Sequence, residues 1–347
     1  MLPPSLQHSI SPPDKVAEQA ALSRQQQLTK PPGSLGLLEQ LACRFAGFQG
    51  RAIPVLTKII IRVFAADHGI ATRGVSAFPQ TVTAQMVANF CSGGAAISVL
   101  ARRQGADFAV VNMGCLNPVA DHVLLTNSPI AAATADFSEA AAMSVTQLQA
   151  ALTAGVQALA ADDTISVFVG GEMGIGNTTS AAAILAIMLD LPAARVTGHG
   201  TGITDTQWAL KCQLIDQART LHLCTAEQPL EVLRCVGGFE IAALVGAYLG
   251  AAQRGIPSLV DGFISTVAAL VAVAIDPAVR DWLLFAHRST EAGHQLALSA
   301  LDATPLLALD MRLGEGSGAA LALDIVNAAL CLHRQMASFT EAGVSNG

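Results

Sequence analysis

The stretch KIIIRVFAAD, residues 58–67, decides the fold, because apolar and β-branched residues follow one another almost without interruption and end at a polar loop. Strands buried on both faces have this pattern, whereas strands with one face in water alternate apolar and polar residues. Similar short runs recur along the chain. They are DFAVVNMG (107–114), TISVFVGG (164–171), PSLVDGF (257–263) and DWLLFAH (281–287).

Helical stretches rich in Ala, Leu and Gln separate these runs. We expect helices at 81–104, 138–161, 206–222 and 239–253, and nearer the chain ends at 14–29, 37–48 and 317–337. Apolar strands alternating with helices predict an α/β fold, in which a parallel sheet is covered on both faces. The helices of the two chain ends are expected to form a small lobe. Ligands bind beyond the carboxyl ends of such strands, so the polar residues there are the candidates.

Composition limits the class of protein. The chain has 347 residues, of which 52% are hydrophobic and 13% charged, and its mean hydropathy is +0.49. The longest apolar runs without a charge, 262–275 and 241–253, are shorter than the about 20 residues of a membrane-spanning helix. The N-terminus has no basic region followed by an apolar core, as a secretory signal would have. We expect a soluble protein that does not bind membranes.

Charge and cysteine content narrow the class further. The net charge is −7 without a basic patch, and one Tyr and two Trp are present, so nucleic acid is not an expected partner. The seven cysteines form no CxxC pair and fit buried residues in a reducing cytosol better than a disulfide framework, which predicts a cytoplasmic protein. Histidines at positions 68, 199, 287 and 294 lack metal-ligand spacing, and no metal is expected.

Residues 171–184, GEMGIGNTTSAAAI, combine two opposed features. Close-set glycines before a helix that Asn177, Thr178 or Thr179 can cap would bind phosphate through backbone N–H groups. Glu172, however, stands where an anion would approach. The stretch lacks both Gly-Lys-Ser/Thr and the last glycine of GxGxxG, so it is neither a Walker loop nor a dinucleotide fingerprint. By itself it leaves a phosphate loop and a ligand-free glycine turn equally open.

Two further loops have similar chemistry. VTGHGTGITDTQWALK (196–211) could bind phosphate with Lys211 as a point charge, although alone it is better explained as a connector with a solvated lysine. LDMRLGEGSGAALALDI (309–325) places Glu315 just before a helix, where glutamate is often only a capping charge. Two Gly-Glu loops at two helix starts, in a chain with so few charges, suggest two carboxylates in one cleft.

Asp67 and His68 end the first strand, within FAADHGIATRGVSAFPQTVTAQM (64–86). His68 could be catalytic, but we expect a hydrogen-bonded histidine at a strand end. A GxSxG motif is absent, and HRSTEAGH (287–294) does not by itself make a hydrolase triad.

Together the motifs resemble one family. KPPGSLGLLEQLA, FAADHGIATRGVSAFPQTVTAQM, GEMGIGNTT, VGGFEIAALVGA, LVDGFIS and DMRLGEGSGAA follow in this order over nearly the whole chain. The sequence resembles the nicotinate-nucleotide–dimethylbenzimidazole phosphoribosyltransferases of cobalamin lower-ligand synthesis. The GEGSGAA and GEMGIGNTT segments are quite specific for this family.

The resemblance implies a fold and an activity. It implies a Rossmann-like large domain, here residues 57–300, a small helical lobe from residues 1–56 and 301–347, and a homodimer without a cofactor. It also implies transfer of the 5-phosphoribosyl group of nicotinate mononucleotide to 5,6-dimethylbenzimidazole or a related base, giving α-ribazole 5′-phosphate and nicotinate. The implied general base is Glu315.

This chemistry explains the opposed features around Glu172. Phosphate and the cationic pyridinium lie at opposite ends of nicotinate mononucleotide, so a loop can bind phosphate while Glu172 faces the cation and Glu315 takes the acceptor's proton. The helix start would lower the pKa of Glu315, whereas burial against Leu313 and Phe78 would raise it. The sequence leaves that balance open.

The acceptor pocket departs from the family pattern at Phe78 and Met86, and Leu37 replaces an arginine, which we expect to matter only for the surface or the lobe. Phe78 is expected to stack on the base and Met86 to pack at its edge, with less hydrogen bonding. The other expected substrate contacts are Met173, Gly174, Gly176, Asn177, Thr178, Thr179, Gly200, Thr201, Gly202, Lys211, Asp261, Ser289 and Leu313.

Two alternatives remain at this point. A Rossmann-like nucleotide-binding oxidoreductase conflicts with the broken glycine fingerprint. A nucleotide sensor without activity would have no need of Glu315 as a proton acceptor.

Overall fold

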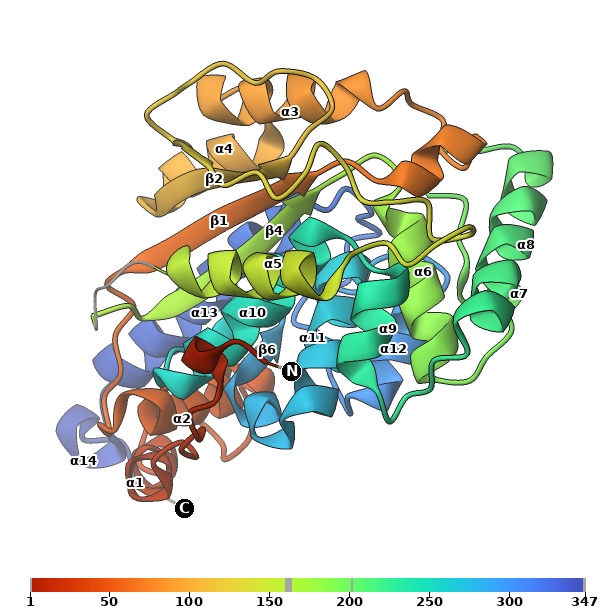
Figure 1. The fold of residues 1–347 in the computed structure, drawn as a ribbon. Helices are drawn as coiled ribbons and strands as arrows, with labels where there is room; N and C mark the ends of the chain where they lie inside the picture. Colours follow the sequence, from red (N-terminus) through yellow and green to blue (C-terminus); the bar gives the residue numbers. More distant parts are fainter. Residues whose placement is uncertain (1, 160–163, 201, 346–347) are drawn as a thin grey trace.

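A computed structural model describes residues 2–159, 164–200 and 202–345, and Figure 1 shows its ribbon. One six-stranded sheet has the order β3-β2-β1-β4-β5-β6, and every strand pair is parallel. The strands are β1 Ile59–Ala66, β2 Asp107–Gly114, β3 Leu125–Asn127, β4 Val167–Met173, β5 Ser258–Val260 and β6 Leu283–Phe285. The parallel sheet and its five expected strands are confirmed. The strand β3 was not expected, because it lies at the sheet edge, where Thr126 and Asn127 are exposed and polar.

The strand order places a crevice beside β1 and β4. Strands β2 and β3 lie on one side of β1, whereas β4, β5 and β6 lie on the other. This is the Rossmann order, and ligands bind where the order reverses, outside the carboxyl ends of the two central strands. Asp67 and His68 follow β1, and Glu172 lies near the end of β4. Both segments therefore meet at the crevice.

Helices cover both faces of the sheet. In Figure 1, α3 and α4 lie on one side of the strands, and α5 and α10 lie on the other. The helices are α1 Lys15–Gln25, α2 Leu37–Gln49, α3 Thr81–Ser92, α4 Ala96–Gln104, α5 Val145–Gln157, α6 Asn177–Met188, α7 Ala193–Val196, α8 Asp205–His222, α9 Pro229–Val236, α10 Phe239–Gln253, α11 Phe263–Ile275, α12 His294–Ala300, α13 Ser317–Gln335 and α14 Phe339–Ala342. Short 3-10 turns are η1 Pro4–Leu6, η2 Gly69–Arg73 and η3 Pro277–Trp282.

Two expected helices differ from the structure. The stretch 81–104 is two helices, because Gly93 has a φ of +85° and donates its N–H to the carbonyls of Asn89 and Phe90, which ends α3. The stretch 138–161 becomes helical only at Val145, because Ser144 forms a capping box with Gln147. Residues 160–163 of that expectation lie outside the described part of the chain.

The helices of the two chain ends pack together, and α13 connects them to the crevice. The Arg24 guanidinium of α1 donates to the carbonyl of His333 near the end of α13, and the Gln25 side chain hydrogen-bonds to the His333 ring. Helix α13 begins directly after the Glu315 loop. A division of the chain at residues 56 and 300 stays a prediction.

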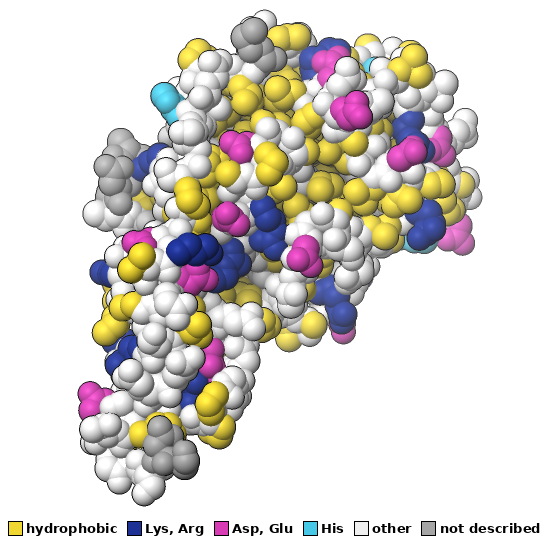
Figure 2. Space-filling model, turned by 90° about the horizontal axis from the view of Figure 1, so that it is seen from below, with side chains coloured by type: hydrophobic (Ala, Val, Ile, Leu, Met, Phe, Trp, Pro, Cys, Tyr) yellow, Lys and Arg dark blue, Asp and Glu magenta, His cyan; other side chains and the backbone are white. Residues whose placement is uncertain are grey.

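The apolar runs 241–253 and 262–275 lie in α10 and α11, most of whose residues are buried, as expected for core helices. One segment, Thr81–Gln104, is long and apolar enough to cross a membrane by length and composition alone. It contains the break at Gly93, and core helices of globular proteins pass the same test. On the face in Figure 2, Lys and Arg side chains lie near Asp and Glu side chains, with hydrophobic side chains around them.

Candidate active site

Hydrogen bonds from several segments hold the loop after β4 in place. Gly176, with a φ of +96°, is the N-cap of α6, and the Asn177 amide donates to the Glu172 carboxyl. The Ile175 N–H donates to the Thr83 hydroxyl over 3.2 Å, and this hydroxyl donates to Asp67 over 2.7 Å. Glu172 is 5% exposed. The loop is therefore fixed with its carboxyl group at the crevice.

A buried pair of a carboxyl group and an imidazole, Glu240 and His68, packs against this loop. Glu240 Oε1 lies 2.6 Å from His68 Nε2, and His68 Nδ1 lies 3.0 Å from the Ser180 hydroxyl. A Cβ at Gly174 would collide with the Ala66 carbonyl oxygen and would lie 3.2 Å from both the Glu240 carboxyl and the His68 ring, so glycine lets the loop pack closely here. The expectation that His68 is a hydrogen-bonded histidine at a strand end is confirmed.

The Glu315 loop has an unusual backbone. Gly314, Glu315 and Gly316 all have left-handed φ angles, of 82°, 67° and 86°. Such a conformation costs a residue with a Cβ on the order of 1–2 kcal/mol and is found at functional sites. Asp261 holds it in place, because its carboxylate accepts the N–H of Gly316 over 3.1 Å and that of Ala319 over 2.8 Å. Glu315 Oε2 is buried without a hydrogen-bond partner among the described residues.

The two Gly-Glu loops pack directly on each other. A Cβ at Gly171 would lie 2.5 Å from the carbonyl carbon of Glu315 and 2.9 Å from the nitrogen of Gly316. A Cβ at Gly314 would meet Glu172 Oε1. Both carboxyl groups therefore belong to one cleft, as the two Gly-Glu motifs predicted.

Burial governs the acidity of both glutamates. It raises the pKa of Glu172 well above its usual value, and the negative charges of Glu240 and Asp261 add to the effect. It raises the pKa of Glu315 to about 7, with Asp261 again adding. The lowering of the Glu315 pKa that the nearby start of α13 would cause is outweighed by burial and by the charge of Asp261. The expected burial against Leu313 and Phe78 is wrong: these side chains are exposed, and Glu315 packs on Gly171 instead.

A buried cation lies behind another part of the cleft wall. Lys211, on α8, is buried and donates to the Thr178 hydroxyl over 2.9 Å, close to Gly200. Burial lowers the pKa of Lys211 to about 8. Glu291 lies near Lys211 and Arg312, whose charges both oppose the effect of its burial on its pKa. The explanation of Lys211 as a solvated lysine is therefore wrong.

The lining of the cleft includes many of the expected residues. It comprises Glu172, Met173, Gly174, Asn177, Thr178, Gly200, Ser289, Leu313 and Glu315 from the expected set, and Ile175, Gly262, Phe263, Ile264, His287, Glu291, Arg312 and Gly314 besides. A larger surface hollow between Pro3 and α5 has no titratable side chain in its lining, so the chemistry points to the smaller cleft.

The chain belongs to a known family of transferases. A family model described as "Phosphoribosyltransferase" matches residues 10–344. A nicotinate-nucleotide–dimethylbenzimidazole phosphoribosyltransferase of Pseudomonas putida is 52% identical over 340 residues, which cover 97% of each chain. The chain is a member of the nicotinate-nucleotide–dimethylbenzimidazole phosphoribosyltransferase family. A relative of the same name from Xanthomonas oryzae pv. oryzae is 54% identical over 336 residues, 96% of each chain.

Solved structures show the same fold. The crystal structure of a phosphoribosyltransferase of this name from Thermus thermophilus has a TM-score of 0.90 at 41% identity and covers 96% of this chain and 100% of its own. A structure titled CobT from the same organism has a TM-score of 0.91 at 42% identity, with the same coverage. The Rossmann-like fold that the family resemblance implied is therefore confirmed.

Other residues expected at the site lie outside the lining of the cleft. Asp261 lies behind the Glu315 loop, Thr179 is buried in α6, and Gly176 forms the turn before it. Gly202 is exposed, and Met86 is half-buried on α3. Substrate contact by these residues, and by Lys211 and Phe78, stays a prediction. Thr201 lies outside the described residues.

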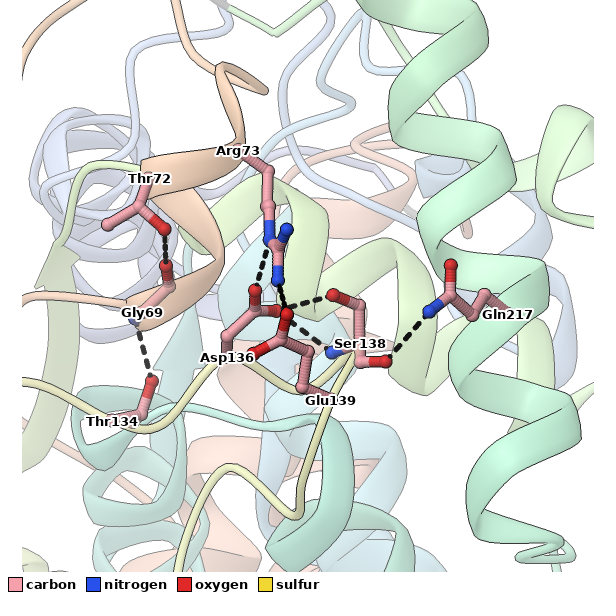
Figure 3. Close-up of polar contacts among 8 residues, drawn as sticks. All are labelled: Gly69, Thr72, Arg73, Thr134, Asp136, Ser138, Glu139 and Gln217. Carbon is pink, nitrogen blue, oxygen red and sulfur yellow. Dashed lines mark hydrogen bonds and ion pairs between the residues drawn. The ribbon is translucent and has the colours of Figure 1, made fainter.

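The segment that precedes the Phe78 loop is fastened to its neighbours, and Figure 3 shows these contacts around Arg73. The Arg73 guanidinium forms ion pairs with Asp136 and Glu139, and Gln217 of α8 donates to the Ser138 carbonyl over 3.0 Å. Phe78 itself is exposed, and its N–H donates to the Ser76 hydroxyl over 3.2 Å.

Sequence reasoning missed Glu240, His287, Glu291 and Arg312. Each lies within a segment already noted: VGGFE for Glu240, DWLLFAH for His287, HRSTEAGH for Glu291 and LDMRLGEGSG for Arg312. The signal was a charged or imidazole group at the end of an apolar segment, in a chain with few charges.

Proposed function

We propose that this chain transfers the 5-phosphoribosyl group of nicotinate mononucleotide to 5,6-dimethylbenzimidazole or a related base in cobalamin lower-ligand synthesis. The observation that carries the proposal is the charge around the cleft: the buried ammonium of Lys211 lies behind Thr178 of its lining, and Glu172 and Glu315 themselves line it. This matches a substrate with phosphate at one end and a cationic ring at the other. Membership of the family supports the same activity.

The reaction exchanges one carbon–nitrogen bond for another. The bond between the ribosyl carbon and the pyridinium nitrogen breaks, and nicotinate leaves with the electron pair, which neutralises its ring. A ring nitrogen of the benzimidazole donates its lone pair to the ribosyl carbon. The proton on the other ring nitrogen is then lost to Glu315, whose pKa of about 7 suits a general base.

The remaining residues bind and orient the substrates. Lys211, the backbone around Gly200 and the start of α6 hold the phosphate, because exposed N–H groups and a buried ammonium favour an anion. Glu172 faces the pyridinium and then the developing positive charge on the ribosyl carbon. Asp261 is a positioning residue that holds the backbone of the Glu315 loop.

We further infer a soluble, cytoplasmic homodimer that works without a cofactor, a membrane or nucleic acid. All seven cysteines are free, which suits a reducing compartment. The net charge of −7 supports the absence of a nucleic-acid partner.

Product analysis tests the activity. The protein is mixed with nicotinate mononucleotide and 5,6-dimethylbenzimidazole, and both products are quantified over time. Nicotinate and α-ribazole 5′-phosphate in equal amounts are expected. A protein that binds the nucleotide and gives neither product, with dimethylbenzimidazole or any related base, would overturn the proposal.

A further inference from the structure

The acidic end of the cleft contains more carboxyl groups than nearby cations can pair. Glu172, Glu240, Asp261 and Glu315 are each at most 5% exposed. Glu240 pairs with His68, and Asp261 lies 3.8 Å from His287 Nε2. Among the described residues, no three acids or histidines are placed to hold a metal ion. The cations in and behind the cleft wall, Arg312 and Lys211, lie near Glu291 instead.

Glu172 lies beside two other acids of this group, Glu240 and Asp261, and no cation pairs with it among the described residues. Among the described residues its carboxyl group accepts hydrogen bonds from the Asn177 amide and the Glu315 backbone. The titratable groups around it are Glu240 and Tyr248 of α10, Asp261 after β5 and Glu315 before α13, with His68 and His287 bonded to or facing Glu240 and Asp261. A buried carboxylate without a cation is unstable and takes up a proton.

Two buried carboxyl oxygens in and behind the cleft wall have no hydrogen-bond partner among the described residues. Glu315 Oε2 lines the cleft, is buried and has no hydrogen-bond partner, and Glu240 Oε2 behind the loop is likewise without one among the described residues. Unpaired acceptors next to surplus carboxyl groups favour a group that brings positive charge to this part of the cleft. The pyridinium ring of the nucleotide is such a group.

We propose that Glu172 is a neutral carboxylic acid in the free protein and releases its proton to solvent when the pyridinium ring of nicotinate mononucleotide binds. The inference rests on the proposed function. The O–H bond of Glu172 breaks, the proton passes to buffer, and the carboxylate pairs with the ring cation; nothing is oxidised or reduced. The free cleft thereby avoids an unpaired buried charge, because the charge forms only when its partner arrives.

The same exchange favours product release. When the ribosyl bond breaks, the nicotinate ring becomes neutral, and Glu172 loses its cation. The carboxylate then takes back a proton from solvent, and nothing retains the neutral ring at the acidic end. The proton cycle therefore distinguishes substrate from leaving group by ring charge alone.

Titration calorimetry tests the proposal on the intact protein. Nicotinate mononucleotide, without acceptor, is titrated at pH 7.5 in two buffers that differ in ionisation enthalpy, which gives the number of protons released. We expect about one proton per site, and affinity that rises up to roughly tenfold per pH unit. Ribose 5-phosphate is the matched ligand, because it has the phosphate, whose second pKa is about 6, but no ring cation. It should release little or no proton.

Variants assign the proton. Glu172→Gln should bind the nucleotide without proton release, whereas Glu227→Gln, an exposed glutamate away from the cleft, should behave like wild type. Heat of binding that is independent of buffer in wild type, or undiminished release in Glu172→Gln, would overturn the proposal.

A second measurement covers the case in which Glu172→Gln does not fold. In the infrared difference spectrum of wild type, binding should remove the carbonyl band of a protonated carboxylic acid, and an unchanged band would refute the inference. Turnover without proton release would leave the proposed function standing and reject this inference alone. Binding with proton release but without either product would instead reject the transferase.

Discussion

Gly171 allows a sharp test of how closely the two Gly-Glu loops must pack. A Cβ added by Gly171→Ala would lie 2.5 Å from the Glu315 carbonyl carbon and 2.9 Å from the Gly316 nitrogen, whereas ordinary contact begins at 3.4 Å. The Glu315 carbonyl oxygen is nearer still, and all three obstructing atoms are backbone, so the Glu315 loop must move by at least 0.9 Å. A displacement of about 1 Å at a reacting group can cost on the order of 100-fold in rate. This corresponds to roughly 2.7 kcal/mol of transition-state stabilisation.

The preceding glycine provides a matched control. A Cβ at Gly170 would meet the end of the flexible Leu244 side chain, on the α10 side of the sheet. Gly170→Ala should therefore cost stability, by about 1–3 kcal/mol, and leave the Glu315 loop in place. The assay is kcat/KM for both substrates together with thermal unfolding. Full activity in Gly171→Ala, or an equal loss of activity in Gly170→Ala, would refute the reasoning.

Further predictions concern charge and loop fastening. Lys211→Met should raise KM for nicotinate mononucleotide by roughly 10- to 100-fold, the value of a charge-assisted hydrogen bond, whereas Lys15→Met, at an exposed lysine, should have no effect. Because the pKa of Lys211 is lowered to about 8, wild-type kcat/KM should also fall as pH rises through about 8. The free energy of unfolding of wild type should fall between pH 4.5 and about 7, because Glu315 keeps a proton in the folded protein that it has lost in the unfolded chain. Above pH 7, Glu315→Gln should therefore have a free energy of unfolding that is higher by about 1–3 kcal/mol, and an unchanged pH profile in the variant would contradict this. Arg73→Gln should speed backbone hydrogen exchange in residues 69–80 without a lower melting temperature, and unaltered exchange would show that the ion pairs do not hold the loop.

The strands were predictable because burial on both faces leaves a continuous apolar run. Such runs located five of the six strands, and the rule that ligands bind at carboxyl ends drew attention to Glu172. The Glu315 loop was predictable for another reason, since a second Gly-Glu motif precedes a helix in a chain with few charges, whereas its left-handed backbone was not predicted. Helix ends were less predictable: Gly93 and Ser144 act through caps that periodicity does not reveal.

The acidity of the site could not be predicted from the sequence. The pKa of Glu315 depends on Asp261, which lies 54 positions earlier in the chain, and on close packing against Gly171. Lys211 was expected to be solvated when its stretch was considered alone, yet the fold buries it against Thr178. Phe78 looked like a pocket residue, and the structure leaves it exposed. Burial and long-range charge are properties of the assembled fold, which no local motif contains.

The central claim is that Glu315 takes the acceptor's proton. The most direct measurement is kcat/KM for 5,6-dimethylbenzimidazole against pH, in wild type and in Glu315→Gln. A base acts only when deprotonated, so wild-type activity should fall as pH drops below about 7. The variant should be slower by roughly 10²- to 10⁴-fold and should lack this acidic limb. A variant that retains the wild-type rate and the same limb would contradict the account.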